Sequence, residues 1–320
     1  MKEKAIYITR CNIGWYSKNA NAYRKPLEVA TKYSATLYVG ANCHVPKEIE
    51  EKCAEVVRFR HVYEVLTKVR AGERDKTKIF TGFDFPCMYV GWQLKRRYGC
   101  QWTVFLWDPP SLSHRDGFPP LRWAIDSVFR FFARRCDKLV LNIHSGLLDE
   151  IGYKPRDGQL ELRMQDAWDG VDFAHSCTVA ESEGCDYNFG VMANWSRAKG
   201  GELMAAVMGR MPGKTCLWIG DGPNDGKSRE GICFTGRLPQ EEAFALLKRC
   251  EVLVVPYLST RALKWNYPLK MFEYLLLGRP IIASDNPGNA EISDYYKGRV
   301  SLFKSGDVSD FIEKALRIIE

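Results

Sequence analysis

The sequence predicts an α/β protein in which two parallel-sheet domains follow one another and face across a cleft. Short β-branched or aromatic segments alternate with segments of helical periodicity from one end of the chain to the other. Such alternation is typical of βαβ units. It is interrupted over about 150–186, where the sequence becomes polar and rich in glycine. We therefore expect one domain over 1–178 and a second over 179–320.

The individual elements follow from the same periodicity. In the first domain we expect strands at 5–10, 35–40, 55–59, 78–83, 102–108 and 138–143, with helices at 21–33, 62–72, 87–99 and 121–136. In the second we expect strands at 187–193, 214–220, 232–238, 251–257, 279–285 and 299–303, with helices at 201–211, 239–250, 268–278 and 307–320. Open sheets of this type bind ligands at the carboxyl ends of their strands.

Composition and charge narrow the class of protein. At 46% hydrophobic residues the chain can bury two cores, and no apolar run is long enough to cross a membrane. The eleven cysteines form no CxxC pair, which indicates reduced thiols and a cytoplasmic protein. Residues 1–175 hold 28 Lys+Arg and 21 Asp+Glu, so the whole net charge of 28 − 21 = +7 lies there. An anionic partner is expected to meet the first half.

The stretch NYPLKMFEYLLLGRPIIASD, 266–285, has the features of an anion-binding helix. Pro268 suits the first turn of a helix, and the free amide groups there, with Lys270, favour a phosphate. Glu273 lies one turn further on, where a carboxylate can accept the hydroxyls of a ribose, and Gly278 ends the helix. The combination indicates a nucleoside diphosphate site; the alternative is an ordinary helix with a solvated glutamate.

Three neighbouring stretches allow both a functional and a structural interpretation. LWIGDGP ends a strand with Gly220 and Gly222, where a ligand could approach the backbone, although a plain turn has the same sequence. NWSRAKGG places Asn194, Arg197 and Lys199 before a helix, either as an anion site or as solvated loop residues. FTGRLPQEE and the strand after it are scaffold by default.

The order of these stretches is more specific than any one of them. AKGG, IGDGP, FTGRLPQEE, VLVVPY and PLKMFEYLLLGRPIIASD together resemble the donor-binding domain of the retaining, nucleotide-sugar-dependent glycosyltransferases of family four, in the subgroup with a Pro-x-Lys-x-x-Glu-Tyr loop. The resemblance covers about 187–300 and implies the GT-B fold, two Rossmann-like domains. Over the first half only FLWDPP, DKLVLNI and DGVDF are similar.

The resemblance also implies roles for individual residues. Glu273 would hold the ribose hydroxyls, Lys199 would meet the diphosphate, and Leu238 would lie near the base. Pro268, Leu269 and Lys270 would present the helix amides to the phosphates or the donor sugar.

Three departures qualify these roles. The first glutamate that the family often carries is Trp265 here. The usual phosphate-binding arginine is Asn194, so that Arg197, Lys270 or Arg261 would take its place. The histidine often found at the end of the fifth strand is Trp107.

The expected chemistry is transfer of a sugar from a UDP- or GDP-sugar to a glycan or lipid-linked acceptor with retention of configuration, in surface polysaccharide or glycoconjugate synthesis. Cations and amide dipoles on the leaving diphosphate can supply much of the stabilisation. The sequence contains no Asp-x-Asp pair, so we expect a metal-independent enzyme without a cofactor. A non-catalytic nucleotide- or glycan-binding relative and a sugar-nucleotide epimerase are the alternatives.

The acceptor is expected at 11–25, where Gly14 would let the backbone approach a ligand. Asp108, at the end of the fifth strand, would hold a hydroxyl or only cap its loop, and His114 is expected to be solvated. The helix 121–136 mixes aromatic residues with arginines and resembles a surface that lies on anionic lipid at the inner face of a membrane. The alternative is a core helix with a basic face. Nucleic acid is not expected, because no recognition motif accompanies the charge.

Overall fold

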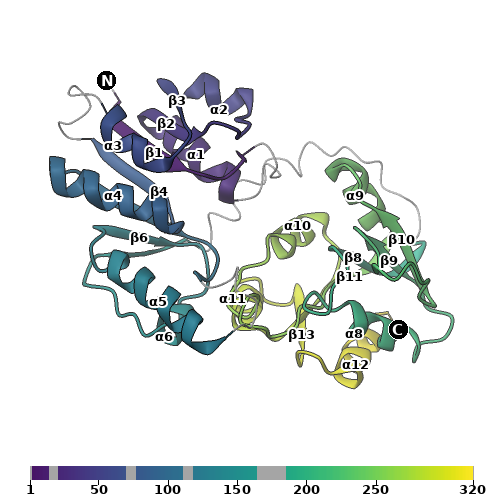
Figure 1. Cartoon of the computed structure of the whole chain (residues 1–320). Helices are drawn as coiled ribbons and strands as arrows, with labels where there is room; N and C mark the ends of the chain where they lie inside the picture. Colours follow the sequence, from purple (N-terminus) through teal and green to yellow (C-terminus); the bar gives the residue numbers. More distant parts are fainter. Residues whose placement is uncertain (1, 14–20, 70–76, 111–117, 164–184, 320) are drawn as a thin grey trace. The chain divides into compact units, whose positions relative to one another are not determined.

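The computed structural model describes residues 2–13, 21–69, 77–110, 118–163 and 185–319. The chain divides into two compact units, Met1–Gly170 and Val171–Glu320, shown in Figure 1. The boundary expected at 178 lies outside the described residues. Each unit is an α/β domain with its own parallel sheet, as predicted.

The first unit has a seven-stranded sheet in the order β3-β2-β1-β4-β5-β6-β7. Its strands are β1 (Lys4–Thr9), β2 (Ser34–Gly40), β3 (Glu55–Phe59), β4 (Lys78–Gly82), β5 (Gln101–Leu106), β6 (Lys138–Leu141) and β7 (Leu160–Leu162). Its helices are α1 (Asn21–Lys32), α2 (Lys47–Lys52), η2 (Val62–Glu64), α3 (Val65–Lys68), α4 (Phe85–Tyr98), α5 (Pro119–Ala133) and α6 (Gly146–Glu150).

Side chains alternate between the two faces of this sheet because successive residues of a strand point in opposite directions. Ala5 and Tyr7 of β1 join Leu37 of β2 in a core that includes Val29 of α1 and Ile49 of α2. α1 and α2 therefore cover the same face. Every strand pair of the sheet is parallel, and parallel sheets need cover on both faces.

The second unit has a six-stranded sheet in the order β10-β9-β8-β11-β12-β13. Its strands are β8 (Tyr187–Met192), β9 (Cys216–Ile219), β10 (Ile232–Gly236), β11 (Cys250–Val255), β12 (Ile281–Ser284) and β13 (Val300–Phe303). Its helices are α8 (Gly201–Met208), α9 (Gln240–Leu247), α10 (Leu269–Leu277), α11 (Pro287–Tyr295) and α12 (Val308–Ile319). All its strand pairs are parallel.

Both sheets reverse their strand order between the first strand and the fourth. In the second unit this point lies between β8 and β11, and in the first between β1 and β4. The loops that leave the two strands there diverge to opposite sides of the sheet, which opens a crevice at the carboxyl ends. The topology thus places a ligand site of the second unit after Met192 and after Val255.

Three expectations about individual elements need correction. The helix expected at 62–72 begins as the 3-10 turn η2 and continues only as the short α3. The helix expected at 121–136 begins earlier, at Pro119, and ends at Ala133. The polar stretch after 150 contains β7, a three-residue strand paired with β6. Its pattern Leu-Glu-Leu leaves Leu162 exposed, so it lacks the buried run that would have marked it.

Candidate functional site

The loops after β8 and β11 are in direct backbone contact at the switch point of the second sheet. Leu258 donates its backbone N–H to the carbonyl oxygen of Ala198 at 2.9 Å. A Cβ atom at Gly200 would lie 2.1 Å from the carbonyl oxygen of Pro256, and Gly200 has a φ of 80°. Only glycine meets both conditions. The second glycine of AKGG, Gly201, opens α8.

Two lysines occupy this crevice. Lys199 comes from the loop after β8 and Lys270 from the first turn of α10, and both are partly buried. Burial lowers the pKa of Lys199. Burial also lowers the pKa of Lys270; the charge of Lys199 lowers it further, whereas Glu273 opposes the shift. Within the described part of the chain neither ammonium has an ion-pair partner, so this electrostatic environment favours an incoming anion.

The start of α10 adds unpaired backbone donors to the two cations. Pro268 precedes the helix with a φ of −65°, and Leu269 and Lys270 form its first turn. The amide groups of a first helical turn have no partner inside the helix and carry a partial positive charge. Gly288 fixes this entry, because a Cβ there would lie 2.1 Å from the carbonyl oxygen of Asn266. A helix terminus of this kind, with a lysine in its first turn, can bind an anion.

Glu273 lies one turn into α10 and is 7% exposed. Its carboxylate accepts a hydrogen bond of 3.1 Å from the side-chain amide of Gln240, the first residue of α9. The Tyr274 hydroxyl, beside it in sequence, accepts the backbone N–H of Met192 at 2.8 Å. α10 is therefore fixed to both α9 and the end of β8. From the sequence, Gln240 is expected to be scaffold, because it lies in FTGRLPQEE.

The two glycines of the GDGP turn have different surroundings. A Cβ at Gly220 would lie 2.2 Å from the carbonyl oxygen of Ala193, so the absence of a side chain there permits a close contact between the ends of β8 and β9. A Cβ at Gly222 would meet the Phe234 ring at 3.4 Å, an ordinary contact. Asp221 between them pairs with Arg237 at 2.7 Å, which joins this turn to the turn that precedes Leu238.

The other predicted residues of the second unit lie around this crevice. Asn194 and Arg197 are exposed in the loop after β8, and Leu238 is partly buried after β10. Trp265 replaces the glutamate of the resemblance, and the Lys264 ammonium lies 4.3 Å from the centre of its ring. The chain also links the end of β12 to the loop after β11, because Asn286 donates to the carbonyl oxygen of Tyr257 at 3.0 Å.

In the first unit, the residues predicted to bind the acceptor do not form one cluster among the described residues. Asp108 is partly buried just after β5, and Trp107 packs edge-on against Phe83 with ring centres 5.4 Å apart. Gly14 and His114 lie outside the described residues. Among the described residues no three His, Cys, Asp or Glu side chains are grouped as metal ligands.

A hollow of about 540 Å³ lies at the carboxyl ends of β1, β2 and β3. Its lining includes the cationic Arg10 and Arg60 as well as His61. Arg10 pairs with Asp84, at the entry to α4, at 3.4 Å. This position corresponds, within the first sheet, to the edge at which parallel sheets bind ligands. The sequence analysis pointed to the loop after β1 but not to 60–61.

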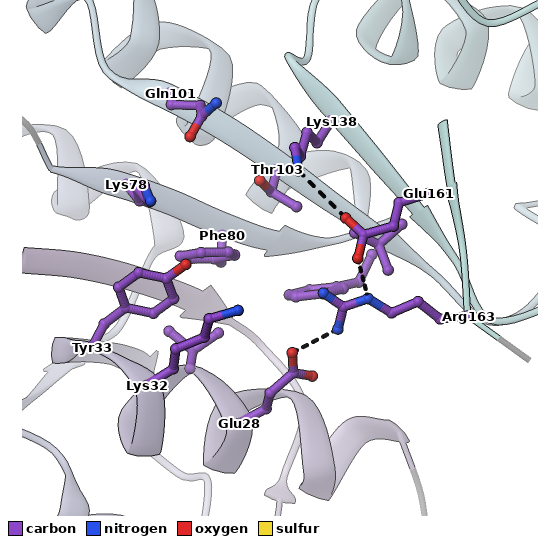
Figure 2. Close-up of a pocket in the computed structure, with 13 residues that line it drawn as sticks. Glu28, Lys32, Tyr33, Lys78, Phe80, Gln101, Thr103, Lys138, Glu161 and Arg163 are labelled. Atoms are coloured by element: carbon purple, nitrogen blue, oxygen red, sulfur yellow. Dashed lines mark hydrogen bonds and ion pairs between the residues drawn. The ribbon is translucent and has the colours of Figure 1, made fainter. Parts of the chain in front are cut away.

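A second hollow, of about 170 Å³, lies on the α1 side of the same sheet and is shown in Figure 2. Arg163 bridges Glu28 at 2.6 Å and Glu161 at 2.5 Å, and Lys138 lies 3.5 Å from Glu161. Lys78 and Lys138 are the first residues of β4 and β6, so the hollow lies toward the amino ends of the strands. Its charged lining residues pair with one another, and we assign no ligand to it.

The described residues contain no helix that is both long and apolar enough to span a membrane. Among the described cysteines, the buried thiols form no disulfide: Cys87, Cys100, Cys136, Cys216 and Cys250. Burial raises the pKa of the Cys136 thiol to about 12, so it is not a nucleophile at neutral pH.

Comparison with known proteins shows the fold and finds one family model that matches the second unit. Residues 188–320 match the family model described as glycosyl transferases group 1. No curated protein sequence matches the chain.

Solved structures are similar over the whole chain. HepE of Anabaena, solved in complex with UDP, is 14% identical, with a TM-score of 0.71 over 99% of this chain and 90% of its own. Sucrose-phosphate synthase of Thermosynechococcus elongatus is 14% identical, with a TM-score of 0.68 over 99% and 90%. The α,α-trehalose 6-phosphate synthase of Burkholderia multivorans is 12% identical, with a TM-score of 0.63 over 100% and 89%. The chain therefore has the GT-B fold, with two Rossmann-like domains, and its second unit is similar to the group 1 glycosyl transferases.

Proposed function

We propose that this protein is a glycosyltransferase that uses a nucleoside diphosphate sugar as donor. The proposal rests on one observation: two lysines, Lys199 and Lys270, lie close enough at the switch point of the second sheet for the charge of one to lower the pKa of the other. Lys270 belongs to the first turn of α10. A diphosphate would occupy this crevice with its charge opposite both ammonium groups and the helix amides. The match of 188–320 to group 1 glycosyl transferases and the UDP complex of HepE support it.

Glu273 is proposed to hold the ribose. Its carboxylate is buried, fixed by Gln240, and one turn from the phosphate-binding end of the helix. Such a carboxylate accepts two hydroxyl hydrogen bonds at a defined distance from the diphosphate. Leu238 would then lie near the base, while Asn194 and Arg197 would border the phosphates. Gly220 and Gly222 shape the neighbouring turn.

The reaction would proceed by departure of the nucleoside diphosphate. As the bond between the sugar carbon and the phosphate oxygen lengthens, negative charge grows on the diphosphate, and Lys199 and Lys270 stabilise it more strongly in the transition state than in the ground state. We propose a retaining, metal-independent transfer in which the leaving phosphate takes the acceptor proton. Asp108 would orient an acceptor hydroxyl, and no protein base is assigned.

The acceptor is proposed to bind the first unit, at the carboxyl ends of its strands. The hollow lined by Arg10, Arg60 and His61 has the volume and charge for a sugar that bears an anionic group. A lipid-linked glycan of a surface polysaccharide or glycoconjugate pathway fits this chemistry. The protein would then work on the cytoplasmic side of a membrane.

Turnover tests the proposal. The purified protein would be incubated with UDP- and GDP-sugars, with and without added sugar and lipid-linked sugar acceptors, and release of the nucleoside diphosphate would be followed. Release that depends on an acceptor supports a transferase. Conversion of the sugar nucleotide without an acceptor would indicate an epimerase, and binding without any turnover would indicate a non-catalytic relative.

A further inference from the structure

The outer face of α5 is apolar, although a helix that covers a sheet ordinarily presents a polar outer face. One side of α5 buries Ile125, Phe129 and Phe132 against the rest of the unit. Beside it runs a stripe of exposed residues at helical spacing, Leu121, Ala124, Val128 and Phe131. The start of the helix adds Phe118 at 72% exposed and Trp123 at 68%. Exposed apolar residues that gather in this way mark an interaction surface.

The apolar stripe continues onto α4, which contacts α5. Trp92 of α4 meets Phe131 edge-on, with ring centres 5.4 Å apart, and Tyr89 lies 6.1 Å from Trp92. Two guanidinium groups stack on these rings, Arg135 at 3.5 Å from the centre of Phe131 and Arg96 at 5.2 Å from that of Trp92. Aromatic rings and cations are thus interleaved on one surface, which we call the α4–α5 surface.

The charge of this surface has one sign. Residues 85–98 and 118–137 contain seven Lys and Arg and two Asp, so their net charge is 7 − 2 = +5. Both aspartates are included in this sum: Asp126 is 6% exposed, and Asp137 pairs with Lys95 at 2.5 Å, so the arginines carry the remaining positive charge. Arg96, Arg97 and Arg134 are exposed.

We propose that the α4–α5 surface docks on an anionic lipid bilayer. Tryptophan and phenylalanine side chains of an interfacial helix enter the headgroup region, while arginines at its edge contact lipid phosphates. The net charge of +5 favours this occupant over a second copy of the chain, which would bring the same positive surface against it. From the sequence, this surface is expected at 121–136 with the basic residues 95–97 nearby, and the structure adds Phe118 and the α4 residues Tyr89 and Trp92.

Co-sedimentation with vesicles tests this inference and needs no turnover. The full chain would be mixed with vesicles of phosphatidylcholine alone and with vesicles containing 30% phosphatidylglycerol. We expect binding only to the anionic vesicles, weakened at least tenfold by the double variant Trp123→Ala, Val128→Glu. The pair Arg96→Glu, Arg97→Glu should weaken binding as much and reduce its salt dependence. Tyr295→Ala, an exposed aromatic of the second unit, should leave binding unchanged.

Other results would overturn the inference. One is wild-type protein that remains in the supernatant with anionic vesicles; another is a set of α4–α5 variants that bind as well as Tyr295→Ala. Analytical ultracentrifugation tests the alternative that a second copy of the chain covers this surface. A wild-type dimer that becomes a monomer in Val128→Glu would support that alternative and overturn the inference. Circular dichroism of each variant ensures that lost binding does not reflect lost folding.

Discussion

The backbone N–H of Leu258 lies 2.9 Å from the carbonyl oxygen of Ala198, and this hydrogen bond joins the two loops that form the candidate donor site. The bond requires the loops to approach each other more closely than side chains at the contact would allow. Gly200 and Pro256 provide that approach. Residues from two segments far apart in the sequence thus come to one crevice.

Replacement of Gly200 tests this contact. Gly200→Ala should destabilise the second unit by about 3 kcal/mol or more, because the new Cβ would overlap the Pro256 carbonyl and the φ of 80° adds strain. Gly213 offers a matched control, with a φ of 81° and no atom within 4 Å of a new Cβ. Gly213→Ala should cost only about 1 kcal/mol. Equal losses in urea unfolding would contradict the close approach.

In the protein without bound nucleotide, Lys199 and Lys270 should lower the free energy of unfolding. Since burial lowers the folded-state pKa of Lys270, its charged form is disfavoured by folding at pH 7. We expect Lys270→Met to raise the free energy of unfolding by about 1 kcal/mol while it weakens nucleotide binding. The gain should shrink as the pH rises through the lowered pKa, where the wild-type lysine becomes neutral. A destabilised variant at pH 7 would refute this account.

Nucleotide affinity should fall at alkaline pH. A bound diphosphate favours the protonated lysines, whereas the free protein, with both pKa values lowered, loses these protons more easily than ordinary lysines do. The dissociation constant for UDP should therefore begin to rise at a pH below that at which an ordinary lysine loses its proton. Titration calorimetry would measure this rise for wild type and for Lys270→Met. Ionisation of the nucleotide affects both proteins equally, so the difference between them reports on Lys270. A rise of the same size in the two proteins would exclude a contribution from Lys270.

Gln240 is expected to position Glu273 rather than to contact phosphate. Loss of its 3.1 Å hydrogen bond in Gln240→Ala should weaken UDP binding about tenfold, within the range for a hydrogen bond to a charged group. Pyrophosphate, which has no ribose, should bind wild type and variant alike. An equal loss for both ligands would mean that the variant disturbs the phosphate site and that Gln240 has no role specific to the ribose.

Much of the fold could be predicted because parallel strands and their helices have different periodicities. The segments around Val254 and Ile282 are short, continuous apolar runs, as strands buried on both faces require. β7 was not predicted, because a three-residue strand at the edge of the sheet buries too few side chains to produce a continuous apolar run in the sequence. The helix expected at 62–72 was wrong because periodicity does not reveal where a 3-10 turn replaces α-helical geometry.

The candidate site was predictable where a local motif carries the chemistry. Lys270 and Glu273 lie in one helix and Pro268 directly precedes it, so their spacing along the chain alone predicts a phosphate contact and a ribose contact. The Gln240 contact could not be read in this way, because it depends on the packing of α9 against α10. The close approach of Gly220 to Ala193 could not be read from the sequence either, because only the strand order brings the ends of β8 and β9 together.

Titration calorimetry of UDP, GDP and ADP with wild type, Lys270→Ala, Glu273→Ala and Lys297→Ala tests the central claim most directly. Lys297 is an exposed lysine at the end of α11 and is the control for loss of one positive charge. The account predicts micromolar binding of one nucleotide, a loss of tenfold or more in the first two variants, and wild-type affinity in Lys297→Ala. If no nucleotide binds, or if Lys270→Ala and Glu273→Ala bind as tightly as wild type, the donor site is not at the start of α10.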